Sequence, residues 1–215
     1  MRIAFPSAAR RVSLDNPQRA INELVGILSE VRGGGRVAAD LEPLACEVIE
    51  TAIGEGAFLL AMVAPDGADP ALLTGVVLEV PRGWDLDSAE ALRDSMEDLG
   101  GPDVRETLAL ETPIGPAVLV QRIPGVERAR TGETRTLQVQ AFVAEPEINR
   151  MLLLTLASPS QRGWDVHQRL FAEMAASASP SAARSAPAAS GRGARRHDAG
   201  TAAAEESFDQ HTYRL

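Results

Sequence analysis

The sequence predicts an α+β protein built on a mainly antiparallel sheet, and three features of its second half carry that prediction. Apolar and polar residues alternate along 137–143, as in a strand with one buried face. Residues 151–156 are almost continuously apolar, which is typical of a strand covered on both faces. Val166, Leu170, Phe171 and Met174 then form one apolar stripe of a helix that can dock on such a sheet.

The remaining elements follow from local signals along the chain. Asn16 and Pro17 mark the start of a helix, and a second helix is predicted from about Asp40. Asp87 and Glu90 resemble a capping box at the start of a third helix. Further strands are predicted where apolar runs end in turn-forming residues, at 58–64, 72–80, 104–111 and 117–123.

The chain divides into three parts on composition. Residues 1–56 are predicted to be a helical N-terminal extension packed on the domain, and residues 57–176 the α/β domain itself. Residues 177–215 are rich in Ala, Ser, Pro, Gly and Arg and nearly empty of large apolar side chains. Such a segment cannot bury enough surface to offset its chain entropy, so a disordered tail is predicted.

Charge and composition exclude several functions. The formal charge is -9, and all 21 basic residues are arginine. A nucleic-acid binder needs a basic face, so nucleic acid is not an expected partner. The single cysteine, Cys46, rules out an internal disulfide. Because no secretory signal or bilayer-spanning run is present, a cytoplasmic protein without an integral membrane segment is expected. The arginine and alanine bias suggests a high-GC bacterial genome.

Several of these elements together resemble the PsbP-like superfamily, which includes PsbP, a Ran-binding import factor and bacterial DcrB-like proteins. The likeness rests on Val-Pro-Arg-Gly-Trp at 80–84 and on the paired strands within 104–123. It also rests on the closing pattern from Leu152 through Trp164 and Phe171 to Ser177. The resemblance covers about residues 57–177. It implies an α/β/α sandwich and non-catalytic work, and it supplies no catalytic residue to carry over.

No arrangement of residues points to catalysis, a metal or a cofactor. The three histidines are His167, His197 and His211, and none has a second ligand at metal-binding spacing. His167 is expected to face solvent or to lie in the cap region of the helix, beside the apolar stripe. Cys46 is expected to be a plain small residue, because nothing near it in sequence would lower its pKa. The protein is therefore predicted not to be an enzyme and to need no cofactor.

A binding role remains, as an adaptor, chaperone or assembly factor for a larger protein complex such as a secretion or injection machine. The sheet face left outward by the alternation would present Gln138, Gln140 and Phe142 to a protein partner. The C-terminal residues Phe208, Tyr213 and Leu215 are a second candidate, as a short docking motif. A carrier of an apolar small ligand stays open as an alternative. An enzyme of unrecognised type also stays open, with a pocket between the sheet and the N-terminal helices and Glu or Asp as its base. So does a homo-oligomer, with the N-terminal helices packed on a second copy.

Overall fold

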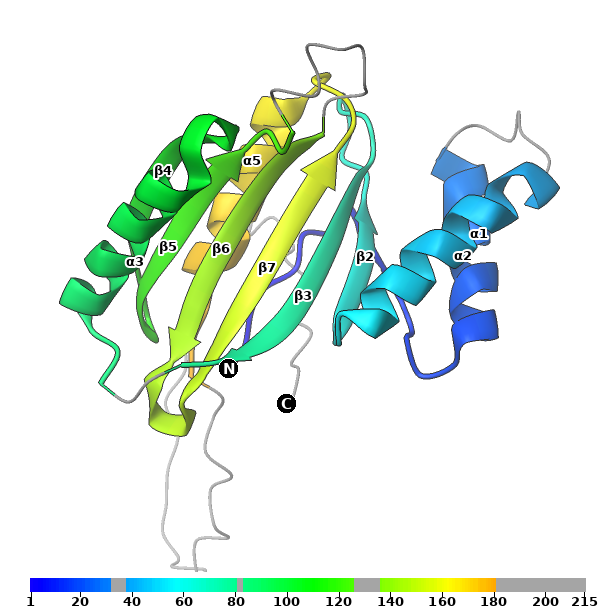
Figure 1. Ribbon diagram of the computed structural model, residues 1–215. Coiled ribbons are helices and arrows are strands. Elements are labelled where there is room, and N and C mark those ends of the chain that lie inside the picture. The colour runs from blue at the N-terminus through cyan, green and yellow to red at the C-terminus, as the bar shows by residue number, and fades with distance from the viewer. Residues whose placement is uncertain (32–37, 81–82, 126–135, 181–215) are drawn as a thin grey trace, which may run out of the picture.

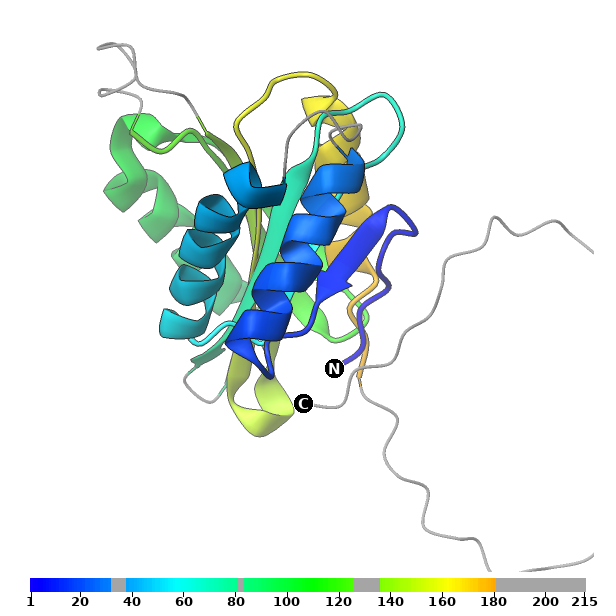
Figure 2. The ribbon, with the colours of Figure 1, turned by 90° about the vertical axis from the view of Figure 1, so that its right-hand side faces the viewer.

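A computed structural model describes residues 1–31, 38–80, 83–125 and 136–180 of the chain. Within these ranges seven strands form one antiparallel sheet in the order β1-β2-β3-β7-β6-β5-β4. Helix α5 (Trp164–Ala176) covers one face, and α1, α2 and α3 lie on the other (Figures 1 and 2). This arrangement confirms the predicted α+β class and the layered sandwich of helices around an antiparallel sheet.

The N-terminal part combines a strand with a helical hairpin. Helices α1 (Pro17–Val31) and α2 (Ala38–Gly54) lie where the sequence predicts them. Strand β1 (Ala9–Val12) is not predicted, and it pairs with β2 at the edge of the sheet. Residues 1–56 are therefore not purely a helical extension. The four residues of β1, Ala-Arg-Arg-Val, show no alternation of apolar and polar side chains. Their own sequence therefore does not predict that they pair with β2.

The sheet centre consists of β3 (Ala71–Glu79), β7 (Arg150–Ser158) and β6 (Leu137–Glu145), with β2 (Leu59–Val63) beside β3. The short 3-10 helix η2 (Pro146–Ile148) joins β6 to β7. On the α5 side the three central strands bury Leu73, Val139 and Leu154 in the main core. The apolar residues of the alternation therefore lie on the face that α5 covers.

The edge of the sheet opposite β1 consists of β5 (Gly115–Arg122) and β4 (Val104–Thr112). Helix α3 (Leu86–Gly100) precedes β4 in the chain, with the short 3-10 helix η1 (Gly101–Asp103) between them. Helix α3 packs on β4 and β5. Its N-cap is Asp85, two residues before the predicted capping-box residue Asp87, because the Asp85 carboxylate accepts from the Ser88 backbone N–H at 2.9 Å and from its hydroxyl at 2.7 Å.

The Asp85 cap gives a pH-dependent prediction. The Ser88 hydrogen bonds hold the pKa of Asp85 below its ordinary value. The cap therefore contributes its full stability at pH values above the Asp pKa of about 3.9 in the unfolded chain. This contribution is lost as the pH falls through the lower pKa that Asp85 has in the folded protein. Asp85→Ala is expected to lower the Tm at neutral pH, and the difference from wild type to shrink in acid. Asp85→Asn, which can still cap, should keep most of the neutral-pH Tm.

The packed part of the chain runs past the end of α5. Ala178 is fully buried, and Ser179 pairs with Arg2 through two backbone hydrogen bonds of 2.8 and 2.9 Å. The predicted tail boundary at residue 177 thus falls within the packed chain. The rest of that predicted tail, residues 181–215, lies outside the described residues.

Candidate functional site

The middle of the sheet is open on the side that carries α1, α2 and α3. Figure 1 shows β3, β7 and β6 lying between α3 and the α1–α2 hairpin with no helix across them. We call this surface the central strip. Its floor consists of Leu72, Thr74, Val76 and Leu78 of β3, Leu153, Thr155 and Ala157 of β7, and Gln138 and Gln140 of β6.

The side chains on the two faces of these strands differ in burial. Every strip residue is half-buried or exposed, whereas Leu73, Leu154 and Val139 on the opposite face are buried. The cause is the placement of the helices. The α1–α2 hairpin packs on Val12, Leu60 and Met62 of β1 and β2, and α3 packs on β4 and β5. No helix in the described ranges is left to cover the three strands between them.

One row of the strip floor is polar, and the rows on either side of it are mainly apolar. Thr74 lies opposite Thr155, and Thr155 lies opposite Gln140. The Gln140 side-chain amide donates to the Thr155 hydroxyl at 3.5 Å. Two residues along, Val76 lies opposite Leu153, and Leu78 is 37% exposed. The strip therefore offers hydrogen-bonding groups and apolar side chains on one surface.

An apolar pocket of about 460 Å³ opens where the strip meets the helical hairpin. Leu24 and Leu28 of α1, Leu44 and Val48 of α2, and Met62, Leu72 and Ala157 of the sheet line it. Its polar end is Asp69, whose carboxylate accepts from the Ser160 hydroxyl at 2.7 Å and lies 3.5 Å from the Arg162 guanidinium. The pocket lies between the sheet and the N-terminal helices, which is where the sequence-based enzyme alternative placed one.

The predicted binding residues do not all lie on the same exposed surface. Gln138 and Gln140 lie on the central strip, as the alternation predicts. Phe142 does not, because it is 7% exposed and packs with Val118 and Met151 in the cluster beneath α3. The prediction that Phe142 is presented outward is wrong, since a helix covers this end of the same face. Phe208, Tyr213 and Leu215 lie outside the described residues.

His167 lies in the first turn of α5. It is 0% exposed, and its Nε2 lies 2.6 Å from the carbonyl oxygen of Asp69. Because a carbonyl can only accept, Nε2 carries the proton and donates. This bond ties the turn between β2 and β3 to the first turn of α5. His167 therefore lies in the cap region of the helix but does not face solvent, because the β2–β3 turn folds over it. Helix periodicity does not encode that contact.

Cys46 lies on α2, where its thiol donates to the Glu50 carboxylate at 3.2 Å. That hydrogen bond and the Glu50 charge raise the pKa of the Cys46 thiol, which disfavours the nucleophilic thiolate.

Across the described ranges, no three His, Cys, Asp or Glu side chains gather closely enough to hold a metal ion. None of the helices in those ranges is long and apolar enough to cross a membrane.

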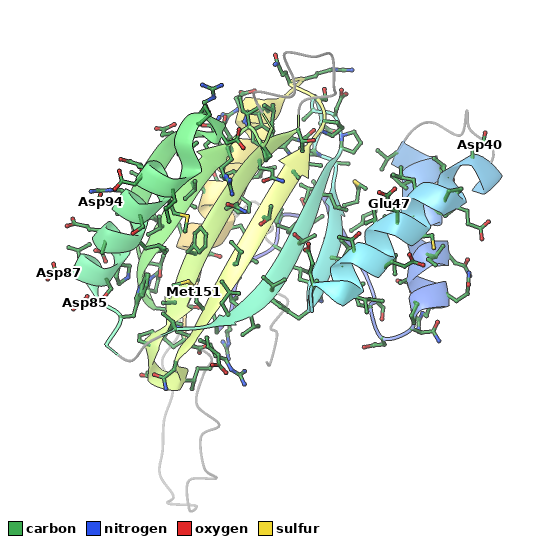
Figure 3. The ribbon with its side chains drawn as sticks, in the orientation of Figure 1. Asp40, Glu47, Asp85, Asp87, Asp94 and Met151 are labelled. Atoms are coloured by element: carbon green, nitrogen blue, oxygen red, sulfur yellow. The ribbon has the colours of Figure 1, made fainter. Side chains whose placement is uncertain are left out.

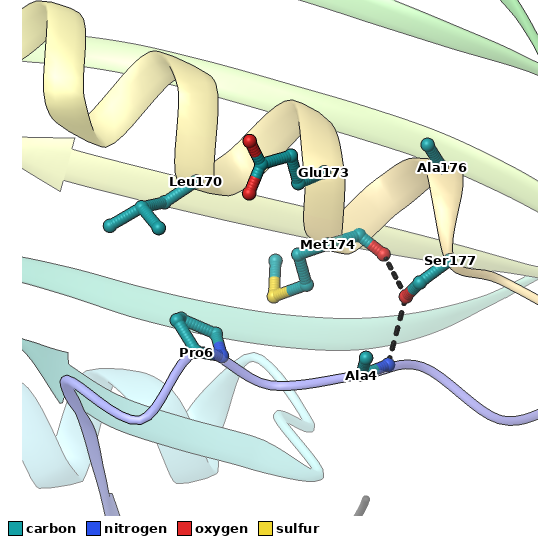
Figure 4. Close-up of a pocket in the computed structure, with 7 residues that line it drawn as sticks. All are labelled: Ala4, Pro6, Leu170, Glu173, Met174, Ala176 and Ser177. Atoms are coloured by element: carbon teal, nitrogen blue, oxygen red, sulfur yellow. Dashed lines mark hydrogen bonds between the residues drawn. The ribbon is translucent and has the colours of Figure 1, made fainter. Parts of the chain in front are cut away.

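A second apolar cavity, of about 430 Å³, lies on the α5 side of the sheet (Figure 4). It is formed by Ala4 and Pro6 of the N-terminal segment and by Leu170 and Met174 of α5, with Glu173 at its border. Ser177 fastens the segment to the helix end, because its hydroxyl accepts from the Ala4 N–H at 2.8 Å and donates to the Met174 carbonyl at 2.6 Å.

Fold and site together define an α/β/α sandwich protein with one helix-free strip. No family model matches the chain, and no curated protein matches its sequence. Among solved structures, the chain is similar to cyanobacterial PsbP (CyanoP) from Synechocystis sp. PCC 6803, at 13% identity and a TM-score of 0.33, over 58% of this chain and 86% of that one. It is also similar to the Ran-binding protein Mog1p of Saccharomyces cerevisiae, at 13% identity and a TM-score of 0.31, over 55% and 68% of the two chains. Both are of the kinds that the sequence motifs resemble.

Proposed function

We propose that this protein is a non-catalytic binding module, an adaptor, chaperone or assembly factor that holds a segment of a partner protein on the central strip. The observation that carries the proposal is the uncovered face of β3, β7 and β6. The same three strands bury most of their other face in the core beneath α5. In an α/β/α sandwich, helices normally cover both faces of the sheet. The strip is therefore the part of the sheet where a covering element from a partner could lie.

The dimensions of the strip suit one partner element. Strands lie about 4.8 Å apart, so three strands make a floor roughly 14 Å wide. A helix with its side chains is about 10–12 Å across, and an extended segment is narrower. The apolar pocket beside α2 supplies a seat for one large side chain. Gln138, Gln140 and the two threonines supply hydrogen-bonding groups beside it.

Capture from the cell of origin tests this function. A tagged wild-type protein should enrich a partner, and a variant blocked on the strip should lose it. A variant changed to the same extent on the opposite face should retain it. A partner that binds all three proteins equally contradicts the strip as the binding site, and no enriched partner with any of them contradicts the function.

A second candidate function, a carrier of an apolar small ligand, has one observation in its favour. The cavity between the N-terminal segment and α5 is large enough for a small ligand and is lined mainly by Pro6, Leu170 and Met174. Native mass spectrometry of the protein purified from its own cell distinguishes the two. A bound species of constant mass, lost in a Leu170→Trp variant that fills the cavity, would favour the carrier.

A further inference from the structure

The two edges of the sheet differ in how they are protected. Strand β1 has four residues, and both Arg10 and Arg11 lie on it, features that discourage pairing with another chain. Strand β4 at the other edge has nine residues and pairs only with β5 among the described strands. In an antiparallel edge strand, alternate residues direct their N–H and C=O groups away from the sheet. About half of the β4 backbone groups therefore face outward.

The α3 side of this edge is acidic. The Thr107 hydroxyl of β4 donates to the Glu97 carboxylate of α3, which places Glu97 over the edge. Glu90 and Asp94 share that helix face, because they precede Glu97 by seven and three residues. Arg93 pairs with Asp94 at 2.8 Å and offsets one of these charges. Figure 3 shows Asp87 and Asp94 on the side of α3 turned away from the central strands.

The α5 side of the edge is partly apolar. Leu110 packs against the core beneath α5, and Leu108, two residues away, points to the same side and is 53% exposed. Glu106 is the charged residue on that side. On the α3 side the strand itself adds Thr107 and Glu111, and Arg105 lies at the bulge where the register shifts.

We infer that the β4 edge is a second docking surface, which accepts an extended segment of a protein partner as an eighth strand. Successive side chains of such a strand point to opposite faces. Residues on the α3 side would meet Glu90, Asp94 and Glu97, and residues on the α5 side would meet Leu108. The chemistry that fits is an alternation of arginine or lysine with aliphatic residues, held by main-chain hydrogen bonds.

A second copy of this chain fits the edge less well. Antiparallel pairing of two β4 strands places the two-fold axis perpendicular to the sheet. The two α3 helices then lie on the same face on either side of that axis, with Glu90, Asp94 and Glu97 of each helix turned toward the other. Like charges opposite one another are destabilising, so a basic partner is favoured over self-association.

The test uses the full chain and a seven-residue peptide of alternating arginine and valine, labelled for fluorescence anisotropy. The control peptide has the same composition, with its arginines in one block. The alternating peptide is expected to bind more tightly and to slow amide hydrogen exchange within 104–112. Equal binding of the two peptides, no binding, or binding without added protection in 104–112 contradicts the inference. The inference is also contradicted if the backbone amides of 104–112 are already fully protected from hydrogen exchange in the free protein.

Charge variants separate the edge from general electrostatic attraction. The double variant Glu90→Arg with Asp94→Arg is expected to weaken peptide binding by roughly tenfold or more, and added salt should weaken wild-type binding. The matched control, Glu42→Arg with Glu50→Arg on α2, changes the net charge equally and should leave affinity unchanged. If both double variants weaken binding alike, the acidic α3 face has no specific role. Blocking the central strip should not affect this peptide, so the two proposals can fail separately.

Discussion

Replacing Gly163 with alanine is expected to destabilise the fold by about 2–5 kcal/mol, from left-handed backbone strain and overpacking combined. Gly163 has φ of 71°, and a Cβ there would lie 2.3 Å from the Ala68 Cβ and 2.5 Å from the Ala68 Cα. The backbone of Ala68 cannot move aside easily. The turn that holds it is fixed to α5 by the bond between His167 and the Asp69 carbonyl.

Gly67→Ala is the matched control for this prediction. Gly67 also has a positive φ, of 80°, but no atom lies within 4 Å of a Cβ built there. Its substitution should cost only the strain, about 1–2 kcal/mol. Urea unfolding monitored by circular dichroism gives both values, provided that the m-values agree. Equal losses in the two variants would mean that the β2–β3 turn does not pack on Gly163 as described.

Blocking the central strip should have the largest effect on binding. Val76→Arg places a long charged side chain on the strip floor, and it is expected to lower affinity for the captured partner by about a hundredfold or more. Val77→Arg is the matched control, because the next residue of the same strand points to the opposite face and is 37% exposed. It should bind the partner as the wild type does.

Stability does not confound this comparison, since both positions lie near the exposed end of β3 and both lose a valine. Substitutions at such strand positions change stability by about 1 kcal/mol or less. Isothermal titration of the purified partner with each variant gives the affinities, and thermal unfolding checks the fold. If Val77→Arg weakens binding as much as Val76→Arg does, the partner does not lie on the strip.

Local patterns predicted most of the elements because each has a signal in its own residues. The alternation at 137–143 gave a strand, and Asn16 with Pro17 gave the start of α1. Strand β1 was missed because its pairing with β2 depends on residues some fifty positions later in the chain. The burial of His167 was missed for a similar reason, since the turn that buries it lies 98 residues away.

The site was harder to predict than the fold, because a strand does not encode which helix covers it. The apolar run at 151–156 predicted cover on both faces, yet Leu153 and Thr155 are only half-buried on the strip side. Phe142 shares a strand face with Gln140, and only α3 decides that one is buried and the other is not. Within β7, Thr155, which interrupts the apolar run, was the sequence signal for an uncovered face.

Site-specific photo-crosslinking tests the central claim most directly. A photoreactive amino acid is placed at Thr155 on the strip, or at Val77 on the opposite face, and the protein is irradiated in its own cells. We expect the Thr155 position to give one dominant crosslinked protein, the same one that affinity capture enriches, and the Val77 position to give none of it. Crosslinks to that protein from Val77 alone, or equally from both positions, would contradict a binding role for the central strip.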